Sequence, residues 1–131
     1  MKKIFICNKI IRDKDVSLFQ ERGIEPETRI LHRDEIVPFL KKKIKEEAQE
    51  ACEAQTPEGT LNEMVDVYEA GMALCHALGI SKEAFWALYK EKHDRKGGFD
   101  QNICLCTLTM STEHPEIHHY LSQPGKYPEK K

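Results

Sequence analysis

Residues 60 to 78 are apolar around almost the whole circumference of a helix, and this pattern limits the fold more than any other feature of the sequence. Two opposite sides of that helix are apolar, formed by Leu61, Met64, Val65, Tyr68, Met72 and Cys75 and by Val67, Ala70, Ala73, Leu74 and Ala77. Such a helix is buried on several sides. A chain of 131 residues forms one domain and has few other helices to cover it. The sequence therefore predicts a mainly α-helical bundle that is completed by self-association into a homodimer or homotetramer.

Hydrophobic periodicity and chain breakers predict three main helices and one short helix before them. The main helices are expected over residues 34–54, 60–78 and 81–96. Asp34 and Ser81 are the expected N-caps of the first and third, and Thr60 is expected to begin the second. The short helix is expected to end at Gly23.

Two segments outside these helices are β-prone. Residues 4–11 and 102–110 are each short enough for one strand, and their pairing would give a small two-stranded β element. The domain is expected to cover residues 1–110. Residues 111–131 contain three prolines and no periodicity, so we expect an extended or partly disordered C-terminal arm.

Two pairs of acidic residues interrupt the apolar pattern. Glu63 and Asp66 lie three residues apart on one face of the second main helix. Glu47 lies within the apolar stripe of the first main helix, and Glu50 lies at its edge. Two antiparallel helices joined by a short loop would bring the pairs opposite each other, where carboxylates repel unless a cation neutralises them. Carboxylate ligands suit Mg²⁺, with Mn²⁺ as the alternative, so the pattern predicts a metal site.

Structural roles can account for some of these acids. Glu63 follows Thr60 at the spacing of a capping box, which alone would explain it. Glu50, like Glu46, could be solvated helix surface. Capping cannot account for Glu47 or for Asp66, because both fall among apolar positions. The metal site is therefore the better interpretation of the four acids together.

Charge and cysteine usage exclude several classes of protein. The net charge of −2 argues against binding to duplex nucleic acid, which normally needs a basic excess. No apolar run is long enough to suggest a membrane span. The N-terminus lacks the features of a secretory signal, and five cysteines without a C-x-x-C motif suit a reducing compartment. We therefore expect a cytoplasmic protein.

Three segments resemble one known family. The pattern "EEAQE…EMVD" resembles the E-E-x-x-E…E-x-x-D signature of the all-α nucleoside triphosphate pyrophosphatases, the MazG-like superfamily. Within it, "NKIIRDK" at residues 8–14 and "KHDRKGGF" at residues 92–99 are similar to segments of the phosphoribosyl-ATP pyrophosphohydrolase-like, or house-cleaning, branch. Two departures stand out: Asp15 and Val16 replace the usual Ile-Pro, and Lys96 replaces the arginine before the double glycine, with Arg95 displaced by one.

The resemblance implies Mg²⁺-dependent hydrolysis of a nucleoside triphosphate between its α and β phosphates, with release of monophosphate and pyrophosphate, in nucleotide-pool house-cleaning. The expected metal ligands are Glu47, Glu50, Glu63 and Asp66. The expected catalytic residues are Glu46, which would orient water or the outer metal shell, Glu47 and Lys92. The expected phosphate-binding residues are Arg12, Lys14, Lys92, Arg95 and Lys96.

Other interpretations also agree with the sequence. The lysines of the third helix could simply extend past the core to reach water, and the basic residues before the first helix could be ordinary surface. The substrate could be phosphoribosyl-ATP rather than a simple triphosphate. The chain could also be a non-catalytic helical module that uses its acids for a structural ion or a partner.

Overall fold

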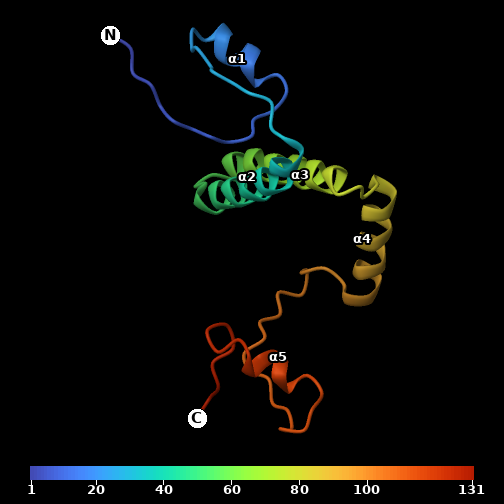
Figure 1. Cartoon of the computed structure of the whole chain (residues 1–131). Coiled ribbons are helices and arrows are strands. Elements are labelled where there is room, and N and C mark those ends of the chain that lie inside the picture. Colours follow the sequence, from blue (N-terminus) through green and yellow to red (C-terminus); the bar gives the residue numbers. More distant parts are fainter. The chain divides into compact units, whose positions relative to one another are not determined.

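The computed structural model describes residues 1–131, and all of its regular structure is helical (Figure 1). The elements are α1 (Asp15–Glu21), α2 (Arg33–Glu53), α3 (Pro57–Ala77), α4 (Lys82–Lys96) and α5 (Ile117–Leu121). The prediction of a mainly α-helical fold with three main helices and a short one before them is confirmed. No helix combines the length and the apolar character that a membrane crossing requires.

The helices α2 and α3 form the central pair of the fold. Only residues 54–56 connect them, and the two helices lie side by side and antiparallel (Figure 1). The N–H of Gly59 donates to the side-chain oxygen of Thr56 at 3.0 Å, and Pro57 follows at the first position of α3. The helix therefore begins three residues earlier than the sequence suggested.

This earlier start removes the structural explanation for one of the acids. Thr60 lies inside α3, where its hydroxyl donates to the carbonyl oxygen of Thr56 at 2.9 Å. A residue in that position cannot form a capping box with Glu63, because the N-cap is Thr56. The carboxylate of Glu63 is thus free for another role.

The start of α2 is fixed by an ion pair instead of by Asp34, because the N-cap is His32. The N–H of His32 donates to Glu35 at 2.9 Å, and both terminal nitrogens of Arg29 also bind the Glu35 carboxylate, at 2.9 and 2.7 Å. The bidentate ion pair with Arg29 and the hydrogen bond from His32 lower the pKa of Glu35 to about 2.

We expect Glu35→Gln to lower the melting temperature at pH 7. A carboxyl group whose pKa is depressed by folding stabilises the native state above its ordinary pKa of 4.5, and this contribution is lost as the pH falls through about 2. Thermal melts over this pH range should therefore show a difference from the wild type that shrinks as the pH falls. The control is Asp34→Asn, one residue away in the same turn; an equal loss in both variants at pH 7 would contradict the prediction.

The core of the chain is small. Its buried apolar residues are Leu40, Ala51 and Ala70, and the only buried charged residue is Glu47. Small alanine side chains on α2 and α3 let the two helices approach closely, but they bury little apolar surface. Large side chains on α3 stay about half exposed or more, namely Leu61, Met64, Val65 and Tyr68. Self-association remains the predicted way of covering them.

Residues Gly97–Lys131 form a second compact unit, separate from Met1–Lys96. It contains α5, where the ring of Tyr120 packs edge-on against the rings of Tyr127 and His119. The domain boundary after residue 110 remains a prediction.

The predicted two-stranded β element is wrong, because neither segment forms a strand. Asn8 and Asn102 adopt left-handed backbone conformations, with φ of 47° and 53°. Asn8 interrupts the segment of residues 4–11, and Asn102 lies at the start of the segment of residues 102–110. A two-stranded element is marginal on its own, and these segments gain no further strand to pair with.

Candidate metal centre

Five carboxylates gather where α2 faces α3. They form two overlapping groups, the first made of Glu46, Glu47 and Glu50 and the second of Glu47, Glu63 and Asp66. Within each group, one oxygen from each residue lies within 4.8 Å of the others. The structure thus brings together the four acids that the sequence pattern predicted as metal ligands, with Glu46 beside them. Glu47 is the member that both groups share.

The environment of Glu47 is unusual for a charged residue. The residue is only 5 % exposed, whereas most glutamates lie in water. Its Oε1 lies 2.9 Å from Nζ of Lys43 and forms an ion pair with it. Its Oε2, in contrast, is buried without a hydrogen-bond partner. A buried carboxylate oxygen without a partner is costly. A cation held between Glu47, Glu63 and Asp66 would supply that partner, so the donor set fits a divalent ion of the Mg²⁺ type.

The crowding of the acids also affects their pKa values. Burial opposes ionisation of Glu47, yet Lys43 and the neighbouring carboxyl of Glu63 keep the pKa of Glu47 below its usual value. Partial desolvation and the negative charges of Glu47 and Glu63 raise the pKa of Glu50 to about 7. Glu50 therefore keeps its proton at a pH at which an isolated glutamate would lose it, as expected for a carboxyl group beside other carboxylates.

Two basic residues of the N-terminal segment contact these acids. Nζ of Lys9 lies 2.8 Å from Glu46, and Nη2 of Arg12 lies 3.5 Å from Asp66. The hydrogen bond to Glu46 raises the pKa of Lys9. Arg12 was expected near the substrate from the sequence, but Lys9 was missed, although it belongs to the same "NKIIRDK" segment. The only clue to Lys9 was its place in this segment. The β-prone residues of the segment suggested a strand, and not a stretch that carries two basic residues to the acids.

The other predicted phosphate-binding residues do not reach the acids within this chain. Lys14 precedes α1 and is exposed, and it forms no ion pair. Lys92 and Lys96 on α4 are likewise exposed and unpaired. Nε of Arg95 lies 3.0 Å from Glu91, one turn back on the same helix. A role in phosphate binding remains a prediction for all four.

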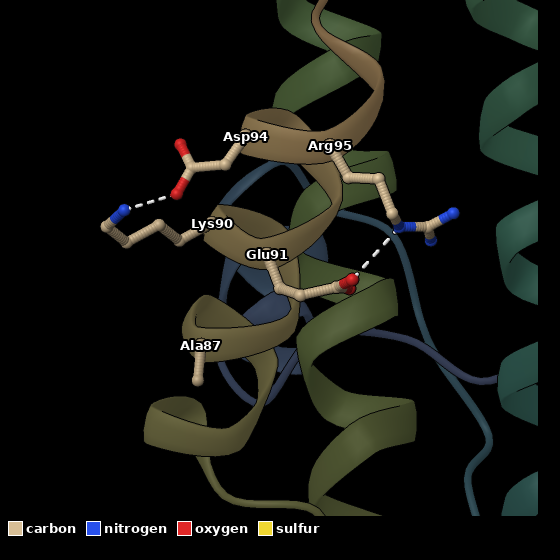
Figure 2. Close-up of a pocket in the computed structure, with 5 residues that line it drawn as sticks. All are labelled: Ala87, Lys90, Glu91, Asp94 and Arg95. Carbon is tan, nitrogen blue, oxygen red and sulfur yellow. Dashed lines mark hydrogen bonds and ion pairs between the residues drawn. The ribbon is translucent and has the colours of Figure 1, made fainter.

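Figure 2 shows the neighbourhood of Arg95 on α4. A shallow surface depression is lined by Ala87, Lys90, Glu91, Asp94 and Arg95. Its charges are satisfied locally, because Lys90 pairs with Asp94 and Arg95 with Glu91, each across one helical turn (Figure 2). This arrangement is typical of a solvated helix face.

A family model described as phosphoribosyl-ATP pyrophosphohydrolase matches residues 17–93, which is more than half of the chain and includes all five carboxylates. The chain belongs to the phosphoribosyl-ATP pyrophosphohydrolase family. Membership makes it a pyrophosphohydrolase of the MazG-like all-α fold, acting on phosphoric anhydrides. Pyrophosphohydrolases of this fold generally use divalent metal ions, in agreement with the acidic groups described above. No curated protein and no solved structure matches the chain.

In this family member, part of the predicted site lies outside the matched residues. Arg12 and Lys14 precede the match, as does Lys9, which was not predicted, and Arg95 and Lys96 follow it. Lys92 is the one predicted phosphate-binding residue inside the match. The family match therefore supports the acidic centre more directly than it supports the basic residues around it.

Proposed function

We propose that this phosphoribosyl-ATP pyrophosphohydrolase family member hydrolyses nucleoside triphosphates, canonical or non-canonical, with Mg²⁺ as its cofactor. Water would add to a phosphorus atom of the α–β anhydride, and cleavage of that bond would release a nucleoside monophosphate and pyrophosphate. The observation that carries the proposal is the buried Glu47, which has one oxygen without a partner and is shared by two groups of acids. Such a site suits the binding of divalent ions that hold a polyphosphate.

The acids of the two helices would have two roles, metal binding and orientation of the attacking water. Glu47, Glu50, Glu63 and Asp66 would hold the ions, with Mn²⁺ able to replace Mg²⁺. When bound, such ions neutralise charge on the phosphate oxygens and favour deprotonation of the attacking water. Glu46 stands at the edge of the group, and its carboxylate would accept a hydrogen bond from that water and orient it.

Basic residues would bind the substrate phosphates. Arg12 is the strongest candidate, because it lies 3.5 Å from Asp66 and its guanidinium can grip a phosphate with two hydrogen bonds. Lys14, Lys92, Arg95 and Lys96 complete the proposed set. The last three lie on α4 and would need either movement or a second copy of the chain to reach the acids.

The test is an incubation of the purified protein with a panel of canonical and modified ribonucleoside and deoxyribonucleoside triphosphates, with Mg²⁺ or with EDTA. We expect equal amounts of monophosphate and pyrophosphate, and no product in EDTA. Release of inorganic phosphate alone would indicate cleavage at the γ phosphate and would contradict the proposal. The absence of product from every compound would also overturn it.

Phosphoribosyl-ATP is the second candidate substrate, because the description of the matching family names it. It carries the same α–β anhydride, so the acids would perform the same chemistry. A comparison of kcat/KM for phosphoribosyl-ATP and for the best simple triphosphate separates the two candidates. The higher value identifies the substrate class for which the site has evolved.

The proposed location of this activity is the cytoplasm. All five cysteines are free, and most of them are exposed. Exposed thiols persist most easily in a reducing compartment.

A further inference from the structure

Each of the two groups of acids is contacted by one cation from the same N-terminal segment. Lys9 binds Glu46, which belongs to the first group, and Arg12 approaches Asp66, which belongs to the second. The cations are three residues apart, so one short stretch of chain serves both groups. Glu47, which lies in both groups, is neutralised by Lys43 from its own helix at 2.9 Å, and the same ammonium lies farther from Glu46, at 3.7 Å, than Lys9 does, at 2.8 Å.

These cations differ in how firmly they are held. Lys43 projects from α2, and its side chain is only 18 % exposed, so it is a fixed part of the site. The side chains of Lys9 and Arg12 are 44 % and 49 % exposed, and both residues precede α1 in a stretch without regular structure. Ion pairs of such exposed groups contribute little to stability, and their loss costs the fold little.

A divalent ion would compete directly with these two residues. Positive charges that share a carboxylate repel each other at short range, so binding of an ion at either group weakens the hold on the neighbouring basic side chain. Once displaced, each cation remains tethered to the site by the chain that carries it. The nearest new anion would be the polyphosphate that the ions hold.

We infer that Lys9 and Arg12 are exchangeable counter-ions, which neutralise Glu46 and Asp66 before metal binds and move to the phosphates of the substrate afterwards. The inference rests on the proposed function for its second half and assigns Lys9 a role that the sequence did not suggest. Lys9 acts as a point charge on a phosphate oxygen, and Arg12 as a bidentate donor. Both residues thus stabilise the metal-free protein through their carboxylate partners. After the substrate binds, they stabilise the complex of protein, metal and substrate through the phosphates.

The inference predicts that loss of Lys9 and Arg12 strengthens the binding of Mn²⁺ and weakens the binding of a triphosphate analogue. The double variant Lys9→Gln, Arg12→Gln should bind Mn²⁺ more tightly than the wild type in the absence of nucleotide, by up to about five-fold for each exposed ion pair removed. The same variant should bind an α,β-methylene triphosphate analogue more weakly at saturating Mn²⁺, by roughly ten-fold or more, because charge-assisted hydrogen bonds to phosphate are lost. Isothermal titration calorimetry measures both constants without turnover.

The control is Lys2→Gln, Lys3→Gln, which removes the same charge from the same segment; Lys2 pairs with Glu25, away from the acids. The control should change both constants little. Weaker Mn²⁺ binding in the Lys9, Arg12 variant would mean that these residues merely support the carboxylates, and it would overturn the inference. Unchanged analogue binding would also overturn it. If wild-type protein binds no Mn²⁺ while Glu47→Gln behaves identically, the proposed metal site itself is wrong, which is a different result.

Hydrogen exchange adds an independent measurement. If the cations leave their carboxylates, the backbone amide of Arg12, which donates to Asp15, should exchange faster when Mn²⁺ is added and should slow again with the analogue. Exchange that slows on Mn²⁺ alone would contradict the proposed displacement.

Discussion

Glu47→Gln is expected to reduce kcat by about 10²- to 10³-fold, because a metal contributes several kcal/mol to charge neutralisation and each 1.36 kcal/mol is worth a factor of ten. Gln keeps the size of the side chain and can still contact Lys43, but its amide removes one negative charge and replaces one oxygen by a donor. Glu47 belongs to both groups of acids, so one substitution weakens both. The measurement is the rate of pyrophosphate release at saturating Mg²⁺.

The same variant should also lose the stabilisation by metal. A ligand that binds only the native state raises the melting temperature, and the rise grows with the ratio of ligand concentration to Kd, so Mg²⁺ should raise the melting temperature of the wild type and barely change that of the variant. The control is Glu53→Gln at the end of α2, where the carboxylate accepts a hydrogen bond from Gln49 and belongs to neither group. Equal rate losses in Glu47→Gln and Glu53→Gln would show that charge on α2, and not a metal site, governs the reaction.

The acidic centre could be predicted from the sequence because helical periodicity determines which side chains share a face. Glu47 and Asp66 interrupt apolar stripes, and a short loop between two helices requires those stripes to meet. The error in the start of α3 came from a competing signal. Thr60 and Glu63 match a capping box, but Thr56 followed by Pro57 is a stronger start, because proline suits the first turn and its missing N–H costs nothing there.

The basic residues could not be predicted equally well, because they lie on an irregular segment. Lys9 and Arg12 reach the acids through a coil whose path is set by Asn8, with its positive φ, and by the hydrogen bond from the N–H of Arg12 to Asp15. Neither feature has a periodic signal in the sequence. Lys92 and Lys96 on α4 present the opposite difficulty. Their spacing is regular, but α4 contacts α3 only slightly, so the spacing does not show which part of the protein these lysines face.

The second large effect concerns self-association, which we expect to be required for stability. Only three apolar residues are buried in the chain, whereas Leu61, Val65 and their large apolar neighbours on α3 remain about half exposed or more. Full burial of such a side chain is worth about 1.5–3 kcal/mol, and the exposed part of several of them adds up to a large fraction of the stability of a domain. A second copy of the chain is the proposed cover, in a homodimer or homotetramer.

The double variant Leu61→Glu, Val65→Glu should therefore sediment as a monomer and melt at a markedly lower temperature than the wild type. The wild type should sediment as a dimer or tetramer, and its melting temperature should rise with protein concentration, because association is coupled to folding. Ile30→Glu is the control, since Ile30 is 92 % exposed but lies between α1 and α2. A wild type that is monomeric at every concentration would refute this prediction.

Activity of a stable monomer would further show that the acids of one chain suffice. Loss of activity with intact Mn²⁺ binding would instead mean that basic residues from α4 of a second copy serve the acids of the first.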